Sequence, residues 1–152
     1  MVERFINNKF EEDYLSTLGY NAYQKQIIYQ NFTISLMIFD VGGQEKFNAL
    51  RKKYATGANT AFIIYDITNR NTFANVGAWK NELYQIAGGI PFIVIGNKAD
   101  LQAERQVPTD EAAQMCSALG ALSFFETSAK TGAGVEEAFQ KLALKTYEFY
   151  VT

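Results

Sequence analysis

Hydrophobic and polar positions follow two different patterns along this chain. Continuous apolar runs, rich in β-branched residues and phenylalanine, lie at Thr60 to Ile67 and Ile90 to Ile95, and they predict strands that are covered on both faces. A further strand is predicted at Leu122 to Glu126. Helical patterns surround these strands and predict four helices, near Phe47 to Tyr54, Asn71 to Ala87, Thr109 to Leu119 and Val135 to Phe149.

The N-terminal part has a different pattern. The short apolar stretch around Phe5 predicts the end of a helix, and the acidic, polar segment Lys9 to Gly19 predicts an exposed loop. Tyr23 to Tyr29 and Thr33 to Val41 are strand-like runs on either side of Gln30-Asn31, which predicts a hairpin. Together with the alternating strands and helices that follow, this pattern predicts a doubly wound α/β domain with a mostly parallel sheet.

Length and composition are consistent with one domain and exclude several classes of function. The chain has 152 residues, 48% of them hydrophobic, which is enough for one core over residues 1–152. Its net charge is −2 with dispersed Lys and Arg, so we expect no nucleic acid and no acidic membrane as partner.

The cysteine, histidine and terminal residues restrict the chemistry further. Cys116 is the only cysteine and histidine is absent, which excludes a disulfide framework, a Cys/His zinc site and His-based catalysis. We therefore expect a reducing, cytoplasmic setting. No apolar signal region, membrane-spanning run or prenylation cysteine is present, so any lipid anchor is expected to lie outside this chain.

Three polar motifs follow predicted strands. Asp40-Val41-Gly42-Gly43-Gln44 follows the hairpin, Asn97-Lys98-Ala99-Asp100 follows the strand that ends near Ile95, and Thr127-Ser128-Ala129-Lys130 follows the last strand. Ligands of doubly wound sheets bind at the carboxyl ends of the strands. The three motifs are therefore expected to line one rim of the sheet.

The second and third motifs suit recognition of guanine. The carboxylate of Asp100 can accept hydrogen bonds from N1–H and the exocyclic amine of guanine, which adenine does not offer in this arrangement. An isolated Asn-Lys-x-Asp match is more often a polar turn, but its position after an apolar strand and the later Ser128-Ala129-Lys130 favour the site. Ala129 would offer its N–H to the guanine carbonyl, and the stems of Lys98 and Lys130 would lie along the purine or ribose.

The first motif suits phosphate chemistry. Asp40 at a strand end can hold Mg²⁺ through a water molecule, because this cation prefers carboxylate oxygen and keeps its waters. Gly43 lets a backbone N–H approach a terminal phosphate, although ordinary turn chemistry explains a glycine there equally well. Gln44 is placed to orient an attacking water as the catalytic residue. Thr17 could offer its hydroxyl to Mg²⁺, but its residue type alone favours an ordinary loop threonine.

In combination these motifs resemble the small GTPases of the Ras superfamily, most closely the Rab-like branch, over essentially the whole chain. The first motif is similar to the Arf-type Asp-Val-Gly-Gly-Gln. Other segments carry the resemblance too: Val2-Glu3-Arg4-Phe5, Tyr14-Leu15-Ser16-Thr17-Leu18-Gly19, Gly43-Gln44-Glu45-Lys46-Phe47, Tyr54-Ala55-Thr56-Gly57-Ala58 and Tyr65-Asp66-Ile67-Thr68-Asn69.

The resemblance implies a molecular switch with GTP, GDP and Mg²⁺ as cofactors and with slow GTP hydrolysis. It makes Thr17 the sensor of Mg²⁺ and the γ-phosphate. It also implies that effectors, exchange factors and GTPase-activating proteins bind through Lys9 to Gly19 and Gly42 to Tyr54. The implied nucleotide-binding residues are Thr17, Gly43, Asn97, Lys98, Asp100, Ser128, Ala129 and Lys130, with Thr17 and Asp40 at the metal.

One family motif is not found in residues 1–152, namely Gly-x-x-x-x-Gly-Lys-Ser/Thr, which cradles the phosphates. In the family this loop follows a strand in the middle of the sheet, and loss of that strand would leave buried backbone groups unpaired, at about 1–3 kcal/mol each. We therefore expect a fragment of a complete GTPase, in preference to a smaller re-paired sheet or a strand supplied by a partner, for example in a strand-swapped dimer. The alternative function is a non-catalytic GTPase-like interaction module with weak or no nucleotide binding.

Overall fold

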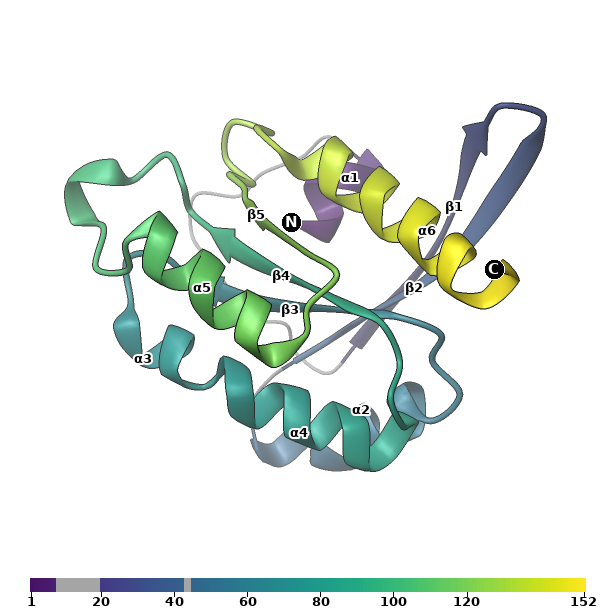
Figure 1. The fold of residues 1–152 in the computed structure, drawn as a ribbon, viewed down its shortest axis with the longest axis horizontal. Helices are drawn as coiled ribbons and strands as arrows, with labels where there is room; N and C mark the ends of the chain where they lie inside the picture. Colours follow the sequence, from purple (N-terminus) through teal and green to yellow (C-terminus); the bar gives the residue numbers. More distant parts are fainter. Residues whose placement is uncertain (8–19, 43–44) are drawn as a thin grey trace.

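The computed structural model describes residues 1–7, 20–42 and 45–152. A parallel sheet with strand order β3-β4-β5 lies at its centre, formed by β3 (Ala61–Asp66), β4 (Phe92–Asn97) and β5 (Ser123–Glu126). Helices α3 (Arg70–Ala74), α4 (Val76–Ala87) and α5 (Thr109–Leu119) cover one face of this sheet (Figure 1). The other face is covered by α1 (Val2–Asn7) and α6 (Val135–Val151). This arrangement confirms the predicted α/β fold with helices on both sides of a parallel sheet.

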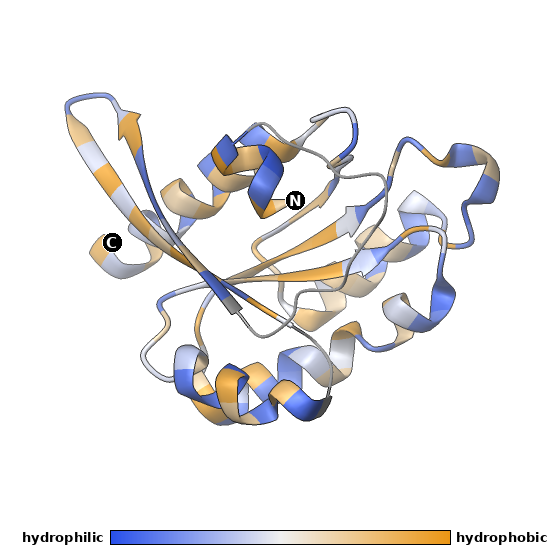
Figure 2. Ribbon diagram, turned by 180° about the vertical axis from the view of Figure 1, so that it is seen from behind, coloured by the Kyte–Doolittle hydropathy of each residue, from blue (hydrophilic) through white to orange (hydrophobic). Residues whose placement is uncertain are grey.

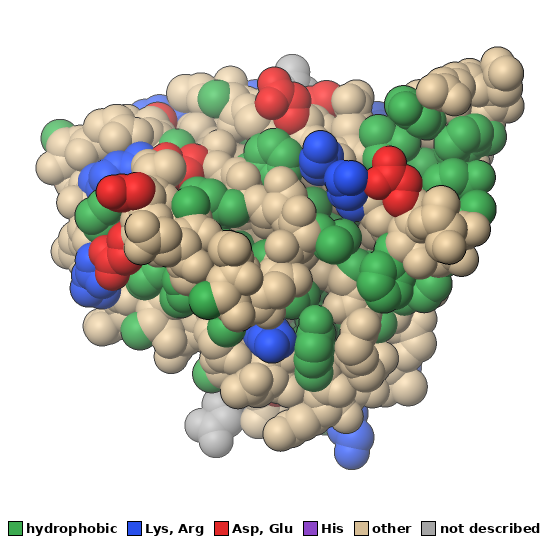
Figure 3. Space-filling model, in the orientation of Figure 1, with side chains coloured by type: hydrophobic (Ala, Val, Ile, Leu, Met, Phe, Trp, Pro, Cys, Tyr) green, Lys and Arg blue, Asp and Glu red, His purple; other side chains and the backbone are tan. Residues whose placement is uncertain are grey.

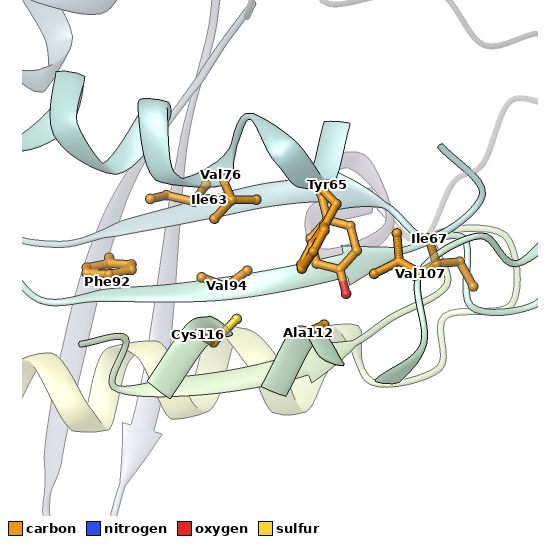
Figure 4. Close-up of a cluster of buried hydrophobic side chains, with 10 residues drawn as sticks. Ile63, Tyr65, Ile67, Val76, Phe92, Val94, Val107, Ala112 and Cys116 are labelled. Carbon is orange, nitrogen blue, oxygen red and sulfur yellow. The ribbon is translucent and has the colours of Figure 1, made fainter. Parts of the chain in front are cut away.

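Strand β4 supplies side chains to the hydrophobic clusters on both faces of the parallel sheet. Phe92 and Val94 belong to the cluster beneath α4 and α5, which Figure 4 shows around Tyr65. Ile93 and Ile95 pack on the other side, against α6. These four side chains are 0% exposed, and burial of one such side chain contributes about 1.5–3 kcal/mol. The unbroken apolar run therefore reflects a strand that is covered on both faces, as predicted.

The predicted helices are present, with one correction. The observed helices are α1 (Val2–Asn7), α2 (Asn48–Ala55), α3 (Arg70–Ala74), α4 (Val76–Ala87), α5 (Thr109–Leu119) and α6 (Val135–Val151), together with 3₁₀ helices at Glu45–Phe47 and Gln102–Glu104. The prediction of a single helix over 71–87 is wrong, because the helix is interrupted at Asn75 and two helices form instead. The N–H of Asn75 donates to the carbonyl of Thr72 as the cap of α3, and its own carbonyl accepts from Trp79 in α4.

The predicted hairpin is also present. Strand β1 (Tyr20–Tyr29) pairs antiparallel with β2 (Phe32–Val41) over their whole length, and Gln30 and Asn31 form the turn. Burial alternates along β2, so Ile34, Leu36 and Ile38 pack toward α1 and α6 while the residues between them are exposed. Figure 2 shows hydrophobic and more hydrophilic positions along the hairpin. The open face of β2 also carries hydrophobic residues, since Met37 and Phe39 are exposed. One face of the hairpin is therefore covered and one is open.

The last turns of α6 lie beside the hairpin (Figure 1), and the ring of Phe32 stacks on Tyr147 with centroids 4.7 Å apart. Hydrophobic side chains gather on this side of the molecule, at the upper right of Figure 3. The exposed large hydrophobic residues at the end of β1 and at the end of α6 are Ile28, Tyr29, Tyr147, Phe149, Tyr150 and Val151. The stacking of Phe32 on Tyr147 joins the hairpin to α6.

The hairpin and the parallel sheet are separate sheets. Within residues 1–7, 20–42 and 45–152, β2 pairs only with β1, and β3 pairs only with β4. The described strands thus do not form one smaller re-paired sheet. Among the helices of the described part, none is both long enough and apolar enough to cross a membrane.

Candidate functional site

The loops that follow β4 and β5 form one hydrogen-bonded unit. Parallel pairing aligns the carboxyl ends of the strands, with Asp66 opposite Asn97 and Gly96 opposite Glu126. The side-chain oxygen of Asn97 accepts hydrogen bonds from the Thr127 hydroxyl (3.2 Å) and from the Ala129 N–H (3.3 Å). The structure thus brings the predicted Asn97 and Ala129 together at one rim of the sheet.

Asp100 is anchored by a buried serine. The hydroxyl of Ser128, which is 1% exposed, donates to Oδ1 of Asp100 at 2.7 Å, and the same oxygen of Ser128 accepts the N–H of Thr131 at 3.1 Å. Asp100 itself is exposed. Because an ionised carboxylate has about four acceptor positions, one bond from Ser128 orients the group and leaves capacity for two further donors.

Lys98 has an unusual backbone and an ion-pair partner. Its φ of 66° lies in the left-handed region, which is uncommon for a residue with a side chain. Its ammonium lies 2.9 Å from Oδ2 of Asp66 at the end of β3. Burial raises the pKa of Asp66, but hydrogen bonds from Thr68 and Lys98 outweigh burial and lower it overall, so Asp66 stays ionised. Asp66 is not among the predicted site residues, although Tyr65-Asp66-Ile67-Thr68 belongs to the resemblance.

Arg4 is a second residue that sequence reasoning missed. From α1 its Nε donates to the carbonyl of Ala129 at 2.6 Å, and its Nη2 donates to the carbonyl of Lys130. The Ala129 N–H is directed at Asn97, so a contact of this N–H with a guanine carbonyl would have to share the hydrogen atom. The Lys130 side chain is exposed. No signal in the sequence links Arg4 to a loop 125 residues away.

Asp40 lies near the end of β2, half-buried and opposite Asn21. Burial raises the pKa of its carboxyl, the amine of Met1 opposes this shift, and Glu3 adds to it. Met1 also lies against Thr127, whose hydroxyl is 3.8 Å from the Met1 sulfur. Met1 therefore lies within electrostatic range of Asp40 and in contact with the loop after β5.

The metal prediction fits Asp40 in one respect. A carboxylate whose charge is disfavoured by burial is suited to a cation, and Mg²⁺ in nucleotide sites takes only one or two protein carboxylates beside water and phosphate. The described residues contain no group of three acidic, cysteine or histidine side chains that could hold a metal by themselves. Thr17, Gly43 and Gln44 lie outside the described residues, so the metal, γ-phosphate and catalytic roles assigned to them stay predictions.

Arg51 connects Gly42, which follows β2, to helix α4. Arg51 donates to the carbonyl of Gly42 at 3.0 Å, and its Nε lies 3.4 Å from a carboxylate oxygen of Glu82. Its guanidinium also stacks over the ring of Trp79, 5.0 Å from the centroid. Arg51 therefore links the first predicted motif to the helical layer of the domain.

A parallel sheet flanked by helices, with Asn-Lys-x-Asp and Ser-Ala-Lys loops joined at its rim, is the arrangement of a small GTPase. A sequence profile described as "Ras family" matches residues 1–148. The chain belongs to the Ras family, and its relatives make it a Rab-like member of the superfamily.

Rab7-type proteins are prominent among these relatives. The chain is 34% identical over 148 residues to "Ras-related protein Rab-7a" of Dictyostelium discoideum, with 94% of this chain and 73% of the relative covered. It is 34% identical over 153 residues to "Ras-related protein Rab7" of Drosophila melanogaster, covering 97% and 73%. It is 33% identical over 157 residues to "Ypt/Rab-type GTPase ypt7" of Schizosaccharomyces pombe, covering 97% and 77%. These matches confirm the Rab-like resemblance.

Proposed function

We propose that this protein is a guanine-nucleotide-dependent molecular switch whose base specificity comes from Asp100. The observation that carries the proposal is the 2.7 Å hydrogen bond from Ser128 to Oδ1 of Asp100 at the carboxyl end of β4. This bond fixes an exposed carboxylate at the edge where ligands of doubly wound sheets bind. The orientation is thus set before a base arrives.

The surrounding groups suit the rest of the base and the ribose. The peptide of Ala129 is held between Asn97 and Arg4, which limits its motion. The aliphatic stems of Lys98 and Lys130 are available for the purine and ribose faces. The ion pair of Lys98 with Asp66 holds one of these stems at the rim. These contacts support guanine over adenine, because guanine presents N1–H and its exocyclic amine side by side to the carboxylate of Asp100 and adenine does not.

The phosphate side of the proposal rests on the family. Ras-family proteins bind GTP, GDP and Mg²⁺, and in this chain Asp40 would contact the hydrated metal. Thr17 would contribute a hydroxyl to the metal, Gly43 a backbone N–H to the γ-phosphate, and Gln44 would orient the attacking water. Hydrolysis would be slow without a partner, because the charge that develops on the transferred phosphoryl group needs an added cation such as arginine.

The switch would be read through two segments, Lys9 to Gly19 and Gly42 to Tyr54. Arg51 supports this role for the second segment, because it links Gly42 to Glu82 and Trp79 of α4. A change of contacts at the γ-phosphate would then alter a surface that effectors, exchange factors and GTPase-activating proteins contact.

Titration of fluorescent GDP and GTP into the 152-residue chain, with and without Mg²⁺, tests the proposal. Asp100→Asn keeps the shape of the side chain but replaces one acceptor oxygen by a donor. We expect it to weaken GDP binding by about 100-fold or more, since two hydrogen bonds to a charged group contribute roughly 1.5–3 kcal/mol each. The control is Asp110→Asn, an exposed acid in the first turn of α5, which should leave the affinity unchanged.

A second candidate is a GTPase-like interaction module with weak or no nucleotide binding. The observation in its favour is that residues 1–152 contain no Gly-x-x-x-x-Gly-Lys-Ser/Thr, so a triphosphate would meet few fixed N–H groups and cations here. A folded chain that binds neither GDP nor GTP would support the module and refute the switch. Tight, Mg²⁺-dependent binding that Asp100→Asn abolishes would refute the module.

A further inference from the structure

We propose that Arg4 is the positioning residue for Asp100, acting through a relay of hydrogen bonds that crosses the Ser128 to Thr131 loop. This inference rests on the proposed function, because it concerns how the same base site is held. Arg4 belongs to α1, and Asp100 belongs to the loop after β4. The two side chains are not bonded to each other in the relay; the peptide group between Lys130 and Thr131 and the hydroxyl of Ser128 connect them.

The relay begins at the guanidinium of Arg4. Its Nη2 donates to the carbonyl of Lys130, which is one end of the peptide group that joins Lys130 to Thr131. The other end of this peptide group, the N–H of Thr131, donates to Oγ of Ser128 at 3.1 Å. The hydroxyl of Ser128 in turn donates to Oδ1 of Asp100 at 2.7 Å. Every donor in the series points from the cation toward the carboxylate.

The common direction has a physical consequence. A cation at the carbonyl end of a peptide group polarises the group and makes its N–H a stronger donor, and successive bonds in one direction reinforce one another. Ser128 is 1% exposed, so water does not compete for these bonds at its side chain. The charge of Arg4 therefore strengthens the bond that orients Asp100.

Arg4 also fixes the loop on a second side. Its Nε donates to the carbonyl of Ala129 at 2.6 Å, while the N–H of Ala129 donates to Asn97. Gly132, at φ +85°, lets the loop turn beside the stem of Arg4, and a Cβ at Gly132 would lie 3.6 Å from Cδ of Arg4. A planar guanidinium can hold two neighbouring carbonyls at once, which the point charge of lysine does less well.

α1 is held in place independently of the relay. The ring of Phe5 stacks on Phe139 of α6 with centroids 3.9 Å apart, and Val2 is buried in the same cluster. Arg4 therefore reaches the loop from a helix that is already fixed to the domain. Removal of its guanidinium should release the loop without releasing α1.

The test compares GDP with inosine diphosphate, which lacks the exocyclic amine and therefore loses one of the two donors for Asp100. We measure the affinity of the full chain for both nucleotides in the wild type and in Arg4→Ala, Arg4→Lys and Ser128→Ala. The control is Arg70→Ala, an exposed arginine whose partners are Gln106 and Glu111.

Arg4→Ala should lower the GDP-to-inosine-diphosphate affinity ratio by roughly five- to tenfold, the size of one hydrogen bond, and Arg4→Lys should recover part of this loss. In the Ser128→Ala background, Arg4→Ala should change the ratio no further, because the relay is already broken. If the role of Arg4 were purely structural, Arg4→Ala would lower the affinities for GDP and for inosine diphosphate by the same factor. An unchanged ratio in Arg4→Ala would overturn the proposal.

A second readout needs no nucleotide. Hydrogen exchange of the Thr131 amide should be at least several-fold faster in Arg4→Ala and in Ser128→Ala than in the wild type or Arg70→Ala. Ser128→Ala removes the acceptor of this N–H, and Arg4→Ala removes the cation that holds the carbonyl end of the same peptide group. Exchange that Arg4→Ala leaves unchanged would refute the relay. If the wild type binds neither nucleotide, the proposed function fails, and this exchange measurement alone decides the role of Arg4.

Discussion

Two arginine–glutamate pairs with the same geometry differ in burial and should therefore differ in their contribution to stability. Arg105 contacts both carboxylate oxygens of Glu126 at 2.7 and 2.8 Å, and each side chain is 17% exposed. Arg70 contacts both oxygens of Glu111 at 2.8 Å, but these side chains are 49% and 44% exposed. The perturbation is Glu126→Gln, and the matched control is Glu111→Gln.

Glu126→Gln leaves the guanidinium of Arg105 partly buried without its anion. It also weakens the acceptor for the hydroxyl of Thr109, which donates to Glu126 at 3.0 Å. A fully buried pair loses about 3–5 kcal/mol on removal of one partner and an exposed pair about 0–1 kcal/mol, so we expect about 2 kcal/mol for this intermediate burial. For a domain of this size that corresponds to a fall in Tm of ~4–8 °C. Glu111→Gln should be close to the wild type.

The pH dependence has a defined sign. The hydrogen bond from Arg105 lowers the pKa of Glu126 below its ordinary 4.5, and the bond from Thr109 adds to this shift against the effect of burial. A folded-state pKa below the unfolded value contributes stability that is fully present above pH 4.5 and is lost as the pH falls through the lowered pKa. The difference between wild type and Glu126→Gln should therefore shrink at strongly acidic pH.

The assay is urea unfolding followed by circular dichroism at pH 7 and at several values between pH 5 and 2, for the wild type and both variants. Equal destabilisation by Glu126→Gln and Glu111→Gln would refute the argument from burial. A difference between wild type and Glu126→Gln that stays constant down to the lowest pH at which the protein folds would refute the argument from linkage.

Three further predictions concern the cores. Gly96→Ala should cost about 1–3 kcal/mol in urea unfolding, because its Cβ would lie 2.6 Å from Oη and 2.8 Å from Cζ of Tyr65. Tyr65→Phe should reduce that cost in part, since it removes the oxygen and keeps the ring; equal costs in both backgrounds would contradict a clash with Oη. Phe5→Ala should lower the free energy of unfolding by about 3–5 kcal/mol, because Phe5 is 6% exposed and stacked on Phe139; a loss below ~1 kcal/mol would contradict this packing. Cys116, with a pKa raised to about 11 by burial, should react with a thiol reagent at pH 8 only after unfolding; rapid reaction of the native protein would refute its burial.

The fold was largely predictable because its strongest signals are local. The apolar run at Ile90 to Ile95 predicted β4, and the strand runs two residues further, to Asn97. It begins after Pro91, which has no N–H for the ladder but whose carbonyl accepts from Ala61. The break at Asn75 was not predictable from apolar spacing, because it depends on hydrogen bonds of a single polar residue between two helices.

The candidate site was predictable only in part. Asn97, Asp100 and Ser128 belong to short motifs at strand ends, and the structure joins them by direct hydrogen bonds or through Thr127 and Ala129. The contact of Arg4 with the loop after β5 depends on the packing of α1 against α6, so no local sequence pattern predicts it. The ion pair of Lys98 with Asp66 depends in the same way on the alignment of parallel strands.

At Lys98 the residue that would best suit the left-handed backbone is not the residue that supplies a charge to the rim. Glycine would adopt the φ of 66° without steric cost, whereas a residue with a Cβ in this region carries strain of about 1–3 kcal/mol. Glycine would, however, remove the ammonium that lies 2.9 Å from Asp66 at the rim. Selection for a more heat-resistant protein and selection for a charged rim would therefore favour different residues here, and this chain carries the residue that keeps the charge.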